Sequence, residues 1–254
     1  MKTVLLCTDN ELWGFGTRMI SAVLRRAGHS TRLIFLPSES RRYSPDVVEE
    51  AKELAKSADL IGLSCYSRGS QKARQLANGL RELRKPIIWG GLHATLNPAE
   101  CAEAADIVCR GEGEDTILEL AETLEAGRDW GNLRNLAYTR ANEFVMNPVR
   151  PPIPDLNELP LFDFDRDDEY HLTKGHIHRA PPHPSDSPKG QAYFIGARGC
   201  NFHCTYCCNR RLKELYTGNG HYVRRMSVSR YIEQLEKLHR RNFPRATGFS
   251  LLDE

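Results

Sequence analysis

Residues 86–95 read PIIWGGLHAT. This short apolar run, which ends in a pair of glycines, is typical of a buried strand that passes into a tight turn. The same pattern recurs along the first half of the chain, where short apolar runs alternate with segments of helical periodicity. Such alternation predicts an α/β fold, a doubly wound parallel sheet of the Rossmann-like kind. Its ligand crevice is expected beyond the carboxyl ends of the strands.

The pattern gives each element approximate bounds. The expected strands are 3–7, 31–36, 60–64, 86–89 and 107–110; the expected helices are 17–27, one opened by Pro45, one through 73–83, a short one from about Pro98, and 115–126; a small hairpin is expected at 136–139 and 144–146. Together they predict a first domain over residues 1–147.

The composition changes at residue 148. Nine of the 14 prolines fall between Pro148 and Pro188, so residues 148–190 are expected to be a connector with few regular elements. Its histidines are expected to lie in a solvated linker rather than a metal site; they are His171, His176, His178 and His183.

Residues 191–254 are expected to form a strand–helix–strand unit that cannot close a core by itself. The strands are 191–196 and 249–252, and the helix is 228–239. The helix periodicity predicts an inward face made of Val228, Ile232, Leu235 and Leu238.

Composition excludes several classes of protein. The chain has 254 residues, 40% of them hydrophobic and 27% charged, and a mean hydropathy of −0.51, which excludes a disordered or collagen-like chain. No apolar run is long enough to span a membrane, and the start lacks the apolar core of a signal peptide, so a cytoplasmic location is expected. Residues 191–254 carry 11 Lys and Arg against 5 Asp and Glu, a scattered excess that indicates a solvated basic surface.

Four of the eight cysteines lie within residues 200–208, which read CNFHCTYCC. In a cytosolic chain this clustering favours metal or redox chemistry over disulfides. The Cys-x3-Cys-x2-Cys spacing of Cys200, Cys204 and Cys207 allows three thiolates to ligate three irons of a four-iron cluster and leave the fourth open. A zinc knuckle completed by Cys208 or His203 is the alternative.

This spacing, with Tyr206 before the last cysteine and a strand at 191–196, resembles the radical S-adenosylmethionine (radical SAM) enzymes. The resemblance implies that Cys200, Cys204 and Cys207 hold a four-iron four-sulfur cluster, whose open iron binds S-adenosylmethionine. Electron transfer from the cluster would then generate a 5′-deoxyadenosyl radical. Tyr206, Asp253 and Glu254 are the positions at which the resemblance places S-adenosylmethionine contacts.

A doubly wound domain followed by this loop resembles the cobalamin-binding subgroup of the family, over essentially the whole chain. The supporting motifs are GGLHAT at 90–95, RGEGE at 110–114 and the connector PPIPDLNELP at 151–160. A nicotinamide site is disfavoured, because Gly14-Phe15-Gly16 is followed by Met19 where the dinucleotide fingerprint has glycine. Residues 191–254 then correspond to the first β-α-β part of a radical SAM barrel.

The resemblance places cobalamin against loops that follow four strands, where glycines let the backbone approach a bulky ligand. The candidate contacts are Asp9, Glu11, Trp13, Gly14, Ser64, Tyr66, Gly90, Gly91, His93, Thr95, Gly111, Glu112 and Gly113. Glu11 occupies the position where cobalamin domains of the mutase and methionine-synthase type carry the cobalt-binding histidine. A carboxylate is a poor ligand for soft, reduced cobalt, so cobalamin is predicted to bind without a protein histidine on cobalt. Its lower face would be open or shielded by Trp13, while the loop of the rival ligand His93 would line the nucleotide tail.

The leading hypothesis is a cobalamin-dependent radical SAM enzyme, or its N-terminal part, that acts on a small-molecule substrate by methyl transfer to carbon or oxidative cyclisation. An external electron donor such as flavodoxin or ferredoxin is implied, and nucleic acid is not an expected partner. Only two of about six barrel strands fit before residue 254, so a non-catalytic fragment that binds cobalamin and an iron–sulfur cluster is the second hypothesis. The third is a zinc protein that binds nucleic acid through its basic C-terminal part.

Overall fold

The computed structural model describes residues 1–9, 13–180 and 190–252. The described chain divides into two compact units. The first unit comprises residues 1–150 and 168–180, and the second comprises 151–167 and 181–254. Glu11, His183, Asp253 and Glu254, which the sequence analysis singled out, lie outside the described residues.

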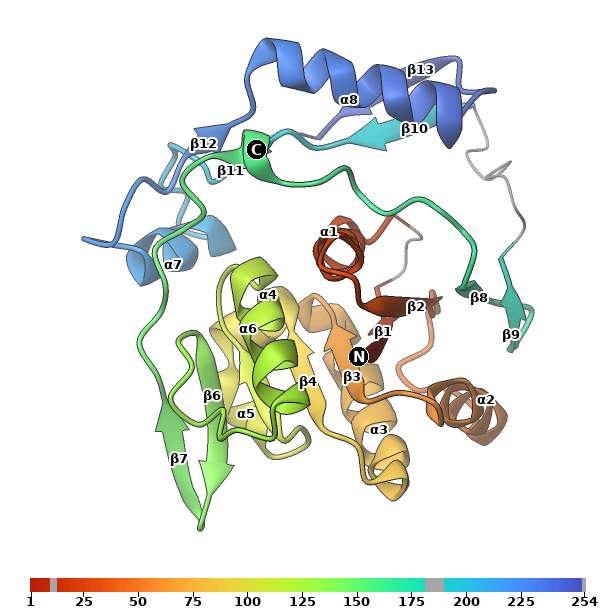
Figure 1. Cartoon of the computed structure of the whole chain (residues 1–254), viewed down its shortest axis with the longest axis vertical. Helices are drawn as coiled ribbons and strands as arrows, with labels where there is room; N and C mark the ends of the chain where they lie inside the picture. Colours follow the sequence, from red (N-terminus) through yellow and green to blue (C-terminus); the bar gives the residue numbers. More distant parts are fainter. Residues whose placement is uncertain (10–12, 181–189, 253–254) are drawn as a thin grey trace. The chain divides into compact units, whose positions relative to one another are not determined.

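The first unit is built on a sheet of nine strands in the order β7-β6-β5-β4-β3-β1-β2-β8-β9 (Figure 1). The strands from β5 to β8 in this order pair in parallel, and β6, β7 and β9 extend the two edges in antiparallel fashion. Their bounds are β1 Lys2–Cys7, β2 Ser30–Phe35, β3 Leu60–Ser64, β4 Ile87–Gly90, β5 Ile107–Cys109, β6 Leu136–Arg140, β7 Glu143–Met146, β8 Glu169–Thr173 and β9 His176–Arg179. The predicted doubly wound parallel sheet is confirmed.

Helices cover both faces of this sheet, because successive side chains of each strand point to opposite faces. Val4 and Leu6 of β1 pack against helices α2 (Pro45–Ala55), α3 (Ser70–Leu80) and α5 (Pro98–Ala102) on one face. Leu5 and Cys7 lie on the opposite face. The helices are α1 Phe15–Arg26, α2 Pro45–Ala55, α3 Ser70–Leu80, α4 Gly91–Leu96, α5 Pro98–Ala102 and α6 Glu114–Glu125, with short 3-10 turns at Ser67–Gly69 (η1) and Arg81–Leu83 (η2). Both faces of the central strands are therefore buried.

The segment predicted to be a connector, 148–190, contains regular structure in both units. Residues 169–179 add β8 and β9 to the edge of the large sheet beside β2. Phe162 and Phe164 are buried in the second unit, where their rings contact Phe194 at 6.1 Å and Phe243 at 5.0 Å between centroids. The expectation of a solvated linker is wrong for these stretches, because their apolar side chains are needed to complete two separate cores.

The second unit contains two short strand pairs and two helices. In the described residues β10 Gln191–Phe194 pairs in parallel with β13 Gly248–Leu251, and β11 Ala197–Arg198 pairs antiparallel with β12 Arg224–Arg225. The helices are α7 Cys208–Leu215 and α8 Val228–Arg241, and a 3-10 turn, η3, spans Leu156–Glu158. The expected strand–helix–strand unit is present, and the antiparallel pair and α7 are additions to it.

The buried face of α8 differs from the predicted one. Val228 and Ile232, expected to point inward, are 76% and 52% exposed. The helix instead packs through Tyr231, whose ring lies 4.6 Å from that of Phe194, and through the buried residues Gln234 and Leu238. Positions 231, 234 and 238 satisfy the 3.6-residue period as well as the predicted set does, so periodicity could not choose between the two faces.

No helix within the described ranges combines the length and the apolar composition needed to cross a membrane.

Candidate functional site

Strand β1 lies between β3 and β2, and the chain leaves β1 and β3 toward opposite faces of the sheet. In a doubly wound sheet this arrangement opens a crevice at the carboxyl ends of the two strands. The two loops are joined there, since the Thr8 amide donates to the Ser64 carbonyl at 3.2 Å and the Thr8 hydroxyl donates to the Gly69 carbonyl at 3.1 Å. A Cβ on Gly69 would lie 2.6 Å from the Thr8 hydroxyl oxygen, so glycine is required for this close approach.

Asp9 and Tyr66, two predicted cofactor contacts, meet at this edge. The Tyr66 amide donates to Asp9 Oδ1 at 2.8 Å. Burial raises the pKa of Asp9, and the hydrogen bond from Tyr66 partly opposes that effect. The Tyr66 side chain is 53% exposed, so its ring is available to a ligand at the edge.

The glycine pair after β4 packs against the loop after β3. Gly91 has a φ of +88°, and a Cβ there would lie 2.9 Å from Ser64 Oγ and 3.1 Å from the Cys65 amide nitrogen. Gly91 therefore permits close contact between two parts of the chain itself. A Cβ on Gly90 would meet only Cys109, at an ordinary 3.8 Å, so this position leaves more room at the edge.

Thr95 connects the two predicted glycine-rich loops. Its hydroxyl donates to the Gly91 carbonyl at 2.9 Å and accepts from the Gly111 amide at 3.0 Å. The Glu112 carbonyl is held by the side-chain amide of Asn135 at 2.8 Å. The structure thus brings the loops after β3, β4 and β5 together, as the sequence predicted, and Asn135 is a contributor that the motifs did not indicate.

His93 lies inside the protein. It is 4% exposed, its Nδ1 is 3.1 Å from the Ser67 hydroxyl, and its Nε2 is 3.6 Å from a carboxylate oxygen of Glu100. Its ring also lies 6.0 Å from the indole of Trp89. Nδ1 has a hydrogen-bonding partner in Ser67, whereas Nε2 is buried without a hydrogen-bond partner among the described residues. His93 is part of the packing beneath the edge.

The loop after β1 is described from Trp13 onward. Gly14 has a φ of +41°, and a Cβ there would lie 2.4 Å from the Phe35 ring. The Trp13 carbonyl accepts a hydrogen bond from Arg18 Nε at 2.9 Å, and the Trp13 ring stacks on Phe15 with centroids 6.1 Å apart. The end of this loop is therefore fixed by α1 and by β2.

A buried ionic cluster supports that loop, and no motif indicated it. Arg18 is 1% exposed and donates two hydrogen bonds to the fully buried Glu169, at 2.7 and 3.0 Å. His171 Nε2 lies 2.6 Å from Glu169 Oε1. Burial alone would raise the pKa of Glu169, but the hydrogen bond from His171 and the charge of Arg18 outweigh it and lower this pKa to about 2. His171, expected in a solvated linker, is a buried member of this cluster.

The cysteine motif lies in the second unit, on the loop between β11 and α7. Cys200, Cys204 and Cys207 are free thiols at least partly accessible to solvent. Among the residues that the structure describes, no three His, Cys, Asp or Glu side chains are arranged so that they could hold a metal ion. The donor chemistry nevertheless fits an iron–sulfur cluster, because three accessible thiols share one short loop.

Two further groups belong to this loop. Gly199 has a φ of +86°, and a Cβ there would lie 2.3 Å from the Tyr222 carbonyl oxygen, so the turn before the first cysteine requires glycine. Tyr206, the predicted S-adenosylmethionine contact, is 91% exposed.

Comparison with known proteins agrees with this geometry. Residues 1–121 match the B12 binding domain family. An uncharacterised methyltransferase of Pyrococcus horikoshii is 27% identical over 228 residues, which cover 86% of this chain and 44% of that protein. The anaerobic magnesium-protoporphyrin IX monomethyl ester cyclase of Rubrivivax gelatinosus is 28% identical over 192 residues, 72% of this chain and 32% of that protein.

Two solved structures share the fold over the whole chain. The radical S-adenosylmethionine methyltransferase TsrM of Kitasatospora setae aligns with a TM-score of 0.71 at 14% identity, and 47% of its chain is covered. The cobalamin-dependent S-adenosylmethionine radical enzyme OxsB aligns with a TM-score of 0.69 at 18% identity, and 34% of its chain is covered. The present chain therefore spans less than half the length of these relatives.

The first unit is a doubly wound α/β domain whose loops gather at the carboxyl edge of its parallel strands. Residues 1–121 match the B12 binding domain family, and the whole chain shares its fold with two cobalamin- or S-adenosylmethionine-dependent radical enzymes, so the resemblance predicted from the sequence is confirmed.

Proposed function

We propose that this chain binds cobalamin at the carboxyl edge of β1, β3, β4 and β5 and carries a four-iron four-sulfur cluster on Cys200, Cys204 and Cys207. In this proposal it is the N-terminal part of a radical SAM enzyme that performs methyl transfer or oxidative cyclisation. The observation that carries the cobalamin part of the proposal is the family match over residues 1–121, which includes every loop gathered at that edge. The cluster part is supported by the three accessible thiols of one short loop.

Several residues would hold cobalamin through main-chain and hydroxyl groups. Ser64 and Gly90 end β3 and β4, and Tyr66 offers an exposed ring. Thr95 holds the Gly91 and Gly111 main chain in place through its hydroxyl. Asp9 holds the Tyr66 amide and so fixes the turn from which that ring projects. When bound, cobalamin would supply a methyl carrier, and the cluster would supply the electron that cleaves S-adenosylmethionine.

The names of the relatives favour chemistry on carbon skeletons. One is a bacteriochlorophyllide methyltransferase of Chlorobaculum tepidum, 26% identical over 181 residues, and the Rubrivivax relative is a cyclase. Methyl transfer and cyclisation therefore both remain within the proposal, with a small-molecule substrate and an external electron donor such as flavodoxin or ferredoxin.

The test is anaerobic reconstitution of the chain with iron, sulfide and cobalamin, followed by metal analysis, paramagnetic resonance and optical titration. The expected result is about four irons and one cobalamin per chain. The variant with alanine at Cys200, Cys204 and Cys207 should lose iron and keep cobalamin, because these cysteines and the cobalamin loops belong to different units. Cys208→Ala is the matched control and should keep both.

Other outcomes separate the competing hypotheses. Zinc without iron, together with salt-sensitive binding to nucleic acid, would replace the proposal with a zinc-dependent nucleic-acid-binding protein. A stable cluster and bound cobalamin without cleavage of S-adenosylmethionine would identify a cofactor-binding part that lacks its own turnover.

A further inference from the structure

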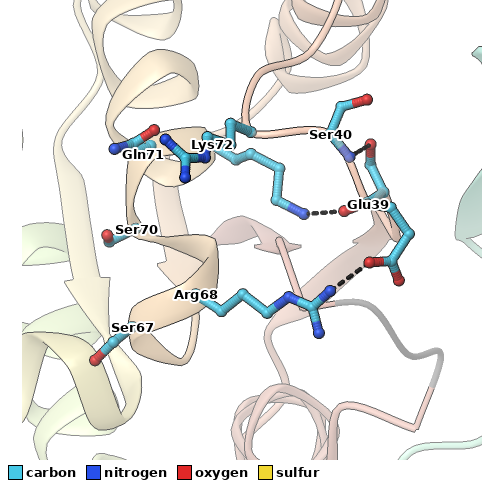
Figure 2. Close-up of a pocket in the computed structure, with 9 residues that line it drawn as sticks. Glu39, Ser40, Ser67, Arg68, Ser70, Gln71 and Lys72 are labelled. Carbon is cyan, nitrogen blue, oxygen red and sulfur yellow. Dashed lines mark hydrogen bonds and ion pairs between the residues drawn. The ribbon is translucent and has the colours of Figure 1, made fainter.

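A polar hollow of about 450 Å³ lies between the segment after β2 and the start of α3 (Figure 2). Its lining includes three basic side chains, Arg41, Arg68 and Lys72, one carboxylate, Glu39, and four serines. The formal charge of this lining is +2, from three cations and one anion. It adjoins the carboxyl ends of β2 and β3, and no motif in the sequence indicated it.

Lys72 provides a cation that is held in place. Its residue is 3% exposed, and its Nζ donates to the Ser38 carbonyl at 2.7 Å. Figure 2 shows this side chain reaching from α3 toward the segment that contains Glu39. A buried ammonium group is costly unless polar partners and opposite charge compensate it. The charges of Asp9 and Glu39 act on Lys72, and an anion in the hollow would add to this compensation.

The Arg68 guanidinium can change its ion-pairing partner. It forms an ion pair with Glu39, and the two side chains are 73% and 78% exposed. Exposed pairs of this kind contribute little free energy. The guanidinium can therefore exchange the carboxylate for a ligand at small cost, and Arg41 on the facing segment adds a second guanidinium.

The start of α3 adds to the positive potential. The turn η1 leads directly into α3, and the first turn of α3 carries no acidic residue. The dipole of a helix favours anions at its N-terminal end. At this end the Gly69 and Ser70 amides already donate to the Tyr66 and Ser67 carbonyls, so the contribution of α3 is its dipole. Ser67 and Ser70 belong to the same wall, but the Ser67 hydroxyl is engaged with His93 Nδ1 at 3.1 Å.

We propose that this hollow binds the phosphate group of a small-molecule ligand. Guanidinium groups and an ammonium group suit a phosphate, which accepts several charge-assisted hydrogen bonds at once. The phosphate belongs either to a separate phosphorylated molecule or to the phosphodiester of cobalamin itself; only the second source rests on the proposed function. The proposal assigns a ligand to residues outside the predicted cobalamin contacts.

The first experiment titrates the chain with inorganic phosphate at constant ionic strength, balanced with potassium chloride, by calorimetry. Arg41→Gln and Arg68→Gln should each weaken phosphate binding about tenfold or more, because each removes a charged donor. Glu39→Gln should act in the opposite direction and strengthen binding, because it removes the competing carboxylate. Arg74→Gln is the matched control: Arg74 lies on α3, but it pairs with Glu103 outside the hollow.

The proposal that the hollow binds phosphate would be refuted if the chain showed no saturable phosphate binding. It would also be refuted if none of the three variants changed the affinity for phosphate. Arg41, Arg68 and Glu39 are exposed, so their variants are expected to fold, and circular dichroism checks this. The proposal therefore does not depend on a substitution of the buried Lys72.

A second titration, with cobalamin present, identifies the source of the phosphate. Loss of phosphate binding on cobalamin loading, with weaker cobalamin binding by Arg68→Gln, assigns the hollow to the phosphodiester of cobalamin. Phosphate binding that persists beside cobalamin assigns it to a separate phosphorylated molecule. If the chain binds phosphate but no cobalamin, the proposed function is refuted, and the proposal that the hollow binds phosphate is still supported.

Discussion

Arg18 and Glu169 are 151 residues apart in the sequence and form a buried, two-pronged ion pair at 2.7 and 3.0 Å. Arg18 belongs to α1, which begins directly after the loop that follows β1, and Glu169 is the first residue of β8. The pair therefore joins β8, the strand next to the edge strand β9, to α1, and Arg18 also donates to the Trp13 carbonyl in the loop where cobalamin contacts are predicted. His171, from the same strand, occupies a second hydrogen-bonding position on Glu169.

We expect Glu169→Gln to destabilise the first unit by about 3–5 kcal/mol at pH 7, because it leaves the buried charge of Arg18 without its counter-ion. All three tryptophans, Trp13, Trp89 and Trp130, belong to the first unit, so urea unfolding followed by tryptophan fluorescence reports on it. Glu82→Gln is the control: it removes an exposed pair with Lys52, and we expect a loss of about 1 kcal/mol or less.

The same pair predicts a specific dependence on pH. The pKa of Glu169 is lowered from its ordinary 4.5 to about 2, so its ionised form is favoured by folding. This contribution is present above pH 4.5 and is lost as the pH falls toward 2. The stability difference between the wild type and Glu169→Gln should therefore shrink by about 3 kcal/mol across that window. A difference that stays constant from pH 5 to pH 2 would contradict the assignment.

The central strands were predictable from sequence because buried parallel strands read as continuous apolar runs, as in residues 60–64. β8 was not predictable, because Glu169 and His171 interrupt such a run with ionisable groups whose partner is distant in sequence. The proline-rich surroundings also favoured a linker. The hydrophobic pattern predicts a strand whose buried side chains are apolar. It did not predict β8, whose buried side chains include an ion-paired glutamate.

Gly91 offers a test of the candidate site itself. Gly91→Ala should lower cobalamin affinity at least tenfold, because the new Cβ would force the β3 and β4 loops apart at Ser64 and Cys65. Gly28→Ala is the matched control, since Gly28 has the same φ of +88° with no atom near its Cβ position. Both variants should lose about 1–2 kcal/mol of stability from the left-handed backbone, but only Gly91→Ala should affect optical titration with cobalamin. Equal cobalamin affinities in the two variants would contradict this role of Gly91.

The face of α8 gives a prediction for the second unit. Leu238→Ala should destabilise it by about 2–5 kcal/mol, because Leu238 is 1% exposed. Val228→Ser should change stability by about 0.5 kcal/mol or less, because Val228 is 76% exposed. Amide hydrogen exchange in β10 and α8 measures both effects, and a large loss in Val228→Ser would restore the face that periodicity predicted.

The lower face of cobalamin provides the last test. Glu11 occupies the position at which mutase-type cobalamin domains carry the cobalt-binding histidine. His93 is 4% exposed, its Nδ1 lies 3.1 Å from the Ser67 hydroxyl, and its Nε2 lies 3.6 Å from a carboxylate oxygen of Glu100. We therefore expect bound, reduced cobalamin to show no nitrogen coupling from the protein in its paramagnetic resonance spectrum, and His93→Ala to leave that spectrum unchanged. Using ¹⁵N-labelled protein with unlabelled cobalamin separates a protein nitrogen from the cofactor's own base. A ¹⁵N coupling that disappears in His93→Ala would show that His93 leaves its buried position to bind cobalt, and would overturn the prediction.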